Sequence, residues 1–173
     1  MPGNFSLVKW GAFLISLLVV GLLGAEPAFA AKVTHIDIPA TVVKLPLAKG
    51  VTPSEAIQSM KLRANFLNFK LVAHQDLSAQ LKAMGAKHVR TLDIYQFCKP
   101  TVAYEMVSFN MAYAAYLPCR IAVVQGKHGH YWLTMLNPKL LLSRKMPPAL
   151  KKSADSVIAG LMKIIKAGAD GAL

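Results

Sequence analysis

Two apolar runs joined by a glycine-bounded turn occupy residues 119–136, which read CRIAVVQGKHGHYWLTML. The first run, Cys119 to Gln125, is rich in β-branched residues, and the second run, His130 to Leu136, contains two aromatic residues. Such residues favour extended strands, and a short connection that begins and ends with glycine is typical of a hairpin. The stretch therefore predicts two neighbouring antiparallel strands.

Helices are predicted on both sides of this hairpin. The sequence Thr52-Pro53-Ser54-Glu55 is a strong helix start, because threonine suits the N-cap, proline the first helical position, and glutamate completes a capping box. We expect this helix to end near Asn68. A second long helix is predicted over Ala149 to Ala167, with an apolar stripe on one side and lysines on the other.

Shorter segments complete the order of elements. Strands are predicted over residues 33–44, 69–74 and 89–97, a helical turn over 78–84, and a helix over 101–111. The order is strand, helix, strand, strand, helix, hairpin, helix. It favours an α+β fold of two layers, with a largely antiparallel sheet packed by helices on one face.

Two motifs resemble a known family. Phe97-Cys98-Lys99-Pro100 follows a predicted strand, Leu117-Pro118-Cys119-Arg120-Ile121 begins the hairpin, and both come after the helix start at Thr52. Together they resemble the bacterial domain-of-unknown-function family 302, over about residues 48–165. The resemblance implies a small α+β domain of the TATA-binding-protein-like type, often exported and often dimeric. It implies no established activity.

The N-terminus has the pattern of a secretory signal peptide. Lys9 precedes an uncharged apolar stretch from Trp10 to Ala25, and Ala28 and Ala30 form the A-x-A pattern that a signal peptidase accepts. We therefore predict a signal peptide over residues 1–30, cleavage after Ala30, and a single α+β domain over residues 31–173. The alternative is a retained anchor, but the apolar stretch is shorter than the ~20 residues that span a bilayer. The predicted location is the periplasm or the exterior.

The charge indicates anionic partners. The chain has 20 Lys and Arg against 8 Asp and Glu, a formal net charge of +12. A basic surface attracts an anionic ligand or an acidic partner. Nucleic acid is excluded as a partner by the predicted export. A weak membrane-surface contact through the last helix is possible only if the apolar stripe of that helix is exposed. The family resemblance implies a second copy of the chain, in a homodimer, as a further partner.

Cys98 and Cys119 are the only two cysteines. An oxidising compartment favours a disulfide between them, which would contribute roughly 3 kcal/mol to stability in the chain-entropy model. In the second interpretation Cys98, before a helix N-terminus and beside Lys99, has a lowered pKa, as does Cys119 beside Arg120. Such thiolates could be redox-active, carry sulfur or bind a soft metal. A third interpretation is two inert thiols.

Other chemistry finds little support in the sequence. We predict no catalytic residue, since no serine has the context of a nucleophile and acidic residues are scarce. We predict no metal site, because His128 and His130 fit a solvated turn and the methionines fit core packing. The cofactor is unknown. The leading hypothesis is a non-catalytic binding or accessory module with a site near Cys98, Cys119, Arg120 and Lys99, and the alternative is a thiol-dependent redox or sulfur-handling protein.

Overall fold

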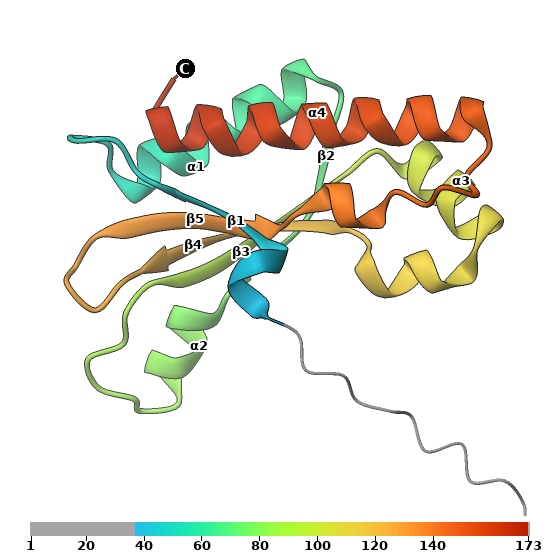
Figure 1. The fold of residues 1–173 in the computed structure, drawn as a ribbon. Coiled ribbons are helices and arrows are strands. Elements are labelled where there is room, and N and C mark those ends of the chain that lie inside the picture. The colour runs from blue at the N-terminus through green and yellow to red at the C-terminus, as the bar shows by residue number, and fades with distance from the viewer. Residues whose placement is uncertain (1–36, 173) are drawn as a thin grey trace, which may run out of the picture. The chain divides into compact units, whose positions relative to one another are not determined.

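The computed structural model of the protein describes residues 37–172. A five-stranded sheet has the strand order β1-β5-β4-β3-β2, and each neighbouring pair is antiparallel (Figure 1). The predicted hairpin forms β4 and β5, and β4 is the central strand. The strands are β1 (Val42–Pro46), β2 (Lys70–Asp76), β3 (Leu92–Cys98), β4 (Cys119–Gln125) and β5 (Tyr131–Leu136).

Two long helices, α1 and α4, lie together on one face of this sheet (Figure 1). The predicted α+β architecture of a largely antiparallel sheet with a helical layer is confirmed. The helices are α1 (Pro53–Phe66), α2 (Leu77–Ala83), α3 (Pro100–Phe109) and α4 (Pro148–Asp170), and the 3-10 helices are η1 (Ile38–Thr41), η2 (Met111–Tyr116) and η3 (Pro138–Leu141).

The start of α1 is as predicted. The Thr52 hydroxyl accepts a hydrogen bond from the Glu55 amide at 3.2 Å, and the Glu55 carboxylate accepts one from the Thr52 amide at 2.8 Å. These reciprocal bonds satisfy amide groups that have no partner within the helix. They also hold the pKa of Glu55 below its usual value. The start of α1 is thus determined by a few adjacent residues.

The core lies between the sheet and the pair α1 and α4. Phe97, Ile121 and Leu133 from three adjacent strands are fully buried against Ile164 and Ile165 of α4. Side chains alternate between the two faces of a strand, so every second residue of β3, β4 and β5 faces the helices. The apolar stripe of α4 is therefore covered. A membrane-surface contact through this helix would need that stripe exposed, and it stays a prediction.

The ends of several elements differ from the predictions. Within the strand or strand pair predicted over residues 33–44, Ile38–Thr41 forms η1 instead, with Pro39 near its start, and β1 begins only at Val42, at an edge of the sheet. The predicted helix over 101–111 ends at Phe109, because Asn110 is extended and its side chain accepts a hydrogen bond from the Ala112 amide at 2.9 Å. The chain then turns into η2, which the sequence did not reveal.

The predicted signal peptide over residues 1–30 lies outside the described residues. Within residues 37–172, none of the helices is both long and apolar enough to cross a membrane.

Two carboxyl groups lie opposite each other where the end of β2 pairs with the start of β3, at Asp76 and Asp93. The Asp76 carboxylate accepts a hydrogen bond from the Ala79 amide at 2.7 Å, which lowers its pKa. Asp93 accepts a hydrogen bond from Ser78 at 3.2 Å, but burial and then the neighbouring Asp76 raise its pKa. The folded protein therefore binds the proton of Asp93 more tightly than the unfolded chain does.

We expect Asp93→Asn to raise the melting temperature at neutral pH. A raised folded-state pKa gives a contribution that is fully present below the unfolded-state pKa and is lost as the pH rises through the folded-state pKa. Asparagine keeps the hydrogen-bonding capacity without the charge, so the gain should be less than about 1 kcal/mol at this partly exposed position. Thermal melting of the wild type and of Asp93→Asn, at a series of pH values from acidic to neutral, measures this gain in stability. A gain that persists unchanged at the acidic end would contradict the assignment.

Candidate functional site

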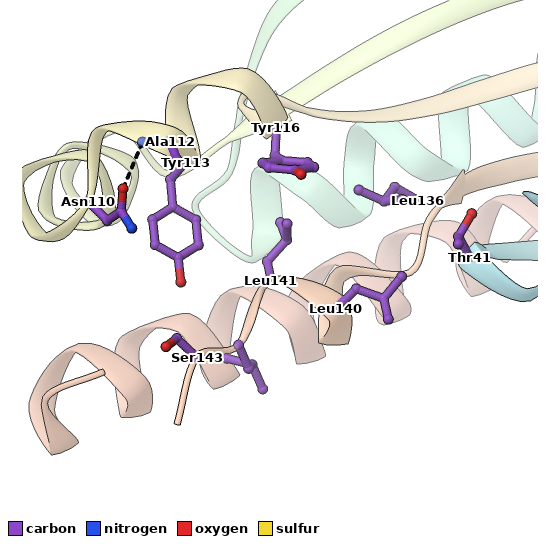
Figure 2. A pocket seen from close by; sticks show the side chains of 10 residues that line it. Thr41, Asn110, Ala112, Tyr113, Tyr116, Leu136, Leu140, Leu141 and Ser143 are labelled. Atoms are coloured by element: carbon purple, nitrogen blue, oxygen red, sulfur yellow. Dashed lines mark hydrogen bonds between the residues drawn. The ribbon is translucent and has the colours of Figure 1, made fainter. Parts of the chain in front are cut away.

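A groove of about 420 Å³ lies between η2 and η3 (Figure 2). Tyr113 and Tyr116 extend into it from η2, and Leu140 and Leu141 line the opposite side. Leu136, at the end of β5, lies at one end of the groove. The remaining lining residues are Thr41, Asn110, Ala112, Leu142 and Ser143. The wall is thus mainly apolar, with a few polar groups at its edges.

Local hydrogen bonds hold both walls of the groove. The Asn110 side chain caps the amide of Ala112 and fixes the start of η2, as the dashed line in Figure 2 shows. The Asn137 side chain accepts a hydrogen bond from the Lys139 amide at 3.2 Å and fixes the start of η3. Asparagine favours such turns because its side chain bonds to the backbone two residues further on. The groove is therefore shaped by two asparagine turns.

A smaller cavity of about 60 Å³ adjoins this groove. It shares Tyr116, Leu136 and Leu141 with the groove and adds Cys119 and Arg120. Arg120 is exposed at the start of β4. Within residues 37–172 the only ion pair joins Lys151 to Asp155, so no carboxylate of the described chain neutralises the Arg120 guanidinium. Arg120, which has no ion-pair partner among the described residues, therefore lines the cavity that adjoins the apolar groove.

The two cysteines line a third, small cavity of about 20 Å³ together with Lys99. Both are free thiols in the structure, so the predicted disulfide is not formed there and stays a prediction. The Lys99 ammonium lies over the ring of Phe69, 5.0 Å from its centre. The structure thus brings Cys98, Lys99 and Cys119 to one cavity, and Arg120 to the neighbouring one.

The pKa values of the two thiols count against the interpretation in which they are activated. Burial raises the pKa of Cys98. Burial and then the neighbouring Cys98 raise the pKa of Cys119 to about 11, and Arg120 opposes this shift only in part. Removing a thiol from water disfavours its charged form, and here this effect exceeds that of the adjacent cation. Both cysteines are therefore protonated at neutral pH.

The titratable and nucleophilic side chains near the groove are few. Its lining contains no histidine and no carboxylate. The Ser143 hydroxyl, the one serine of the lining, accepts a hydrogen bond from the Lys145 amide at 3.2 Å. His128 and His130 are exposed beside the β4–β5 turn. In the part of the chain that the structure describes, no three His, Cys, Asp or Glu side chains gather as a metal site.

A second hollow of about 540 Å³ lies along β1 and α4, lined by Leu45, Pro46, Met162, Lys163 and Lys166 among others. It shares no lining residue with the two cavities at Cys119. Only the groove between η2 and η3 continues to Cys119 and Arg120. This continuity makes it the candidate site.

Sequence reasoning missed the groove itself. Its walls come from residues 110–116 and 136–143, which are separated by the whole hairpin. A usable signal was present in the three leucines Leu140 to Leu142, which follow Asn137-Pro138 in a segment interpreted only as a connection. Such a run of leucines after a proline indicates an apolar surface that another part of the chain or a ligand can cover.

Comparisons with known proteins identify a family model and a solved structure that are similar to this chain. A family model described as Domain of unknown function DUF302 matches residues 43–168. A crystal structure of an uncharacterised conserved DUF302 protein from Bacillus stearothermophilus is similar at 20% sequence identity, with a TM-score of 0.60. The match covers 73% of this chain and 97% of that chain. No functionally curated protein matches the chain.

Proposed function

The chain belongs to the family described as Domain of unknown function DUF302, and we propose that it is a non-catalytic binding module for a small anionic amphiphile. The observation that carries the proposal is the apolar groove of about 420 Å³ beside an unneutralised arginine. Pockets for small molecules typically measure ~300–1,000 Å³ and combine an apolar lining with a few polar groups. The groove suits the apolar body of such a ligand.

The charge of the ligand follows from Arg120. A guanidinium donates two parallel hydrogen bonds to a carboxylate or a phosphate, and it keeps its charge at every physiological pH. Since no described acid pairs with Arg120, an anionic group of the ligand would fill this role. The net charge of +12 adds long-range attraction for the same ligand. A carboxylate on an alkyl chain is the simplest molecule with both features.

Dodecanoate and dodecanol form a matched pair of probes. We expect dodecanoate to bind the purified protein, and Arg120→Gln to weaken this binding by about 10-fold or more, the usual effect of losing a hydrogen bond to a charged group. Binding of the neutral alcohol should change little. Isothermal titration calorimetry below the micelle concentration measures both affinities.

Ala112→Trp should remove binding of both probes, because this exposed alanine lines the groove and the indole would fill it. Ala114→Trp is the matched control, since Ala114 is equally exposed on η2 but does not line the groove. Binding that survives in Ala112→Trp as it does in Ala114→Trp would place the ligand elsewhere and refute the proposal.

We further propose that the module acts outside the cytoplasm, as the N-terminal sequence indicates. The intact mass of the exported chain checks this, and a chain that still begins at Met1 would contradict cleavage after Ala30. The homodimer implied by family resemblance stays a prediction.

The redox or sulfur-handling alternative has one supporting feature, namely two free thiols at one cavity. The raised pKa values of Cys98 and Cys119 count against it, because the thiolate is the reactive nucleophile. The binding module is therefore the better supported function.

A further inference from the structure

The strand β1 forms one edge of the sheet and pairs only with β5. Just beyond one end of β1, the Leu47 amide donates a hydrogen bond to the Tyr131 carbonyl at 3.0 Å, and at the other end the Thr41 carbonyl accepts one from the residue after β5 at 2.8 Å. Hydrogen-bonded and non-hydrogen-bonded pairs alternate along an antiparallel ladder, so the odd-numbered residues of β1 bond to β5. The N–H and C=O groups of Val42 and Lys44 therefore point away from the sheet.

The opposite edge of the sheet is less suited to a further strand. There β2 has a register shift between Leu71 and Ala73, and a bulge of this kind disrupts the regular row of outward backbone groups. By contrast, β1 keeps one continuous register with β5 over Val42–Pro46. Pro46 has no N–H to donate, so the outward donors of β1 come only from Val42 and Lys44. Any strand added to β1 is thus limited to a short pairing around these two residues.

The hollow of about 540 Å³ lies directly beside this edge. The Ala48 amide donates a hydrogen bond to the Ala169 carbonyl at 2.8 Å and joins its two walls. Leu45 lines the hollow from β1 and also packs against the core, so its side chain faces the helices. Paired residues of neighbouring strands point their side chains to the same face, so a strand added beside Leu45 would direct every second side chain into the hollow. The wall from α4 consists of residues at steps of three and four, which share one side of a helix, namely Met162, Lys163, Lys166, Ala169 and Asp170.

The surroundings of this edge are basic. Lys163 and Lys166 are exposed on α4 and line the hollow, which has Asp170 as its one acidic residue. Lys44 is exposed on the other face of β1, with its ammonium 4.0 Å from the centre of the Trp132 ring. Within residues 37–172 the only ion pair lies nearer the start of α4, so no described carboxylate neutralises these three lysines. A lysine at a sheet edge disfavours indiscriminate pairing, whereas an acidic strand would neutralise its charge.

We propose that β1 binds an extended segment of a partner protein as an additional strand, and that this segment alternates apolar and acidic residues. Its backbone pairs with Val42 and Lys44, its apolar side chains enter the hollow, and its carboxylates lie near Lys44 on the opposite face. In strand addition the main-chain bonds give affinity and the pockets for alternate side chains give specificity. The surface goes beyond the proposed amphiphile binding and is separate from it, since the hollow shares no lining residue with the groove.

A fluorescein-labelled peptide of about six residues, alternating glutamate and valine, has a length that matches β1 and tests the proposal by fluorescence anisotropy. We expect saturable binding to the purified protein, weakened by added salt because the charges involved are exposed. The same peptide with lysine in place of glutamate should not bind. Equal binding of the two peptides would overturn the proposal. So would a protein that ignores the acidic peptide and binds phosphatidylglycerol vesicles instead, because the surface would then serve a membrane.

Two variants of Lys44 test the backbone pairing. Lys44→Pro and Lys44→Gln both remove the ammonium, but only proline removes the outward N–H. We expect Lys44→Pro to bind the acidic peptide about 10-fold more weakly than Lys44→Gln, because one main-chain hydrogen bond is lost. Proline is tolerated at an edge strand where its nitrogen faces solvent, as Pro46 already does two residues further on, and thermal melting checks the fold. Equal affinities of the two folded variants would overturn the pairing.

A second pair of variants tests the charge without touching β1. Lys166→Glu reverses a charge at the hollow, and we expect it to weaken binding of the acidic peptide by about 5-fold, as for an exposed charge pair. Lys152→Glu makes the same change at an exposed position of α4 that does not line the hollow, so it should have little effect. The same loss in both variants would mean that only the net charge of the protein attracts the peptide, and would overturn the proposed surface.

Discussion

Phe97→Ala should destabilise the protein by about 3–5 kcal/mol, which is a large fraction of the ~5–15 kcal/mol that stabilises a typical domain. Phe97 is fully buried on β3, and its ring is part of the core that joins the sheet to α1 and α4. Truncation removes the transfer energy of the ring and leaves a cavity that the surrounding strands cannot close. Urea denaturation measures the loss as a shift of the midpoint at constant slope.

Phe66→Ala is the matched control for this change. Phe66 ends α1 and is 78% exposed, with the Arg63 guanidinium 5.9 Å from the centre of its ring. The same truncation there removes almost no buried area, so we expect an effect within about 0.5 kcal/mol. Equal losses for the two phenylalanines would mean that Phe97 does not occupy the core.

Gly168→Val should cost about 3 kcal/mol or more. A Cβ atom at Gly168 would lie 2.5 Å from Cγ of Met60, 2.9 Å from Cδ1 of Leu133 and 3.1 Å from the Ala56 carbonyl oxygen. The Met60 and Leu133 side chains can move, but the carbonyl belongs to the backbone of α1, so α1 and α4 would have to separate. Replacing a helical glycine gains at most ~1 kcal/mol in propensity, which is less than the cost of overpacking.

The control for this prediction is Ala159→Val on the exposed side of the same helix. It changes only helix propensity, by less than about 1 kcal/mol. Thermal and urea unfolding of the two variants give the comparison. If Gly168→Val were as stable as Ala159→Val, α1 and α4 could not pack as closely as the structure has them.

Local patterns in the sequence predicted most of the elements. The capping box at Thr52 and Glu55 and the glycine-bounded turn of the hairpin each depend on hydrogen bonds or backbone angles within a few residues. Because such a pattern involves only a few neighbouring residues, it can be recognised in the sequence without knowledge of the fold. The apolar stripe of α4 also predicted a buried face, and Leu161 and Ile164 occupy it. Element ends were less accurate, as at Asn110, where a side-chain cap ends α3 early.

The candidate site could be predicted only in part. The motifs at Cys98 and Cys119 predicted that these two residues lie near each other. In the structure both line one cavity. The groove beside them required η2 and η3 to meet, which no local pattern encodes. Met106 was interpreted as a core residue, although it lines the cysteine cavity as well.

The sequence by itself determined the hairpin, the helix starts, the basic charge and the presence of a cysteine pair, because each depends on neighbouring residues or on composition. Only the tertiary structure decided the direction in which the pKa values of the two cysteines are shifted. The expectation of lowered pKa values rested on the adjacent Lys99 and Arg120 and on a helix N-terminus, all of which are local. Burial by distant segments raised the pKa of Cys98 and of Cys119 instead. Desolvation depends on which parts of the chain pack together, and only the folded chain specifies that.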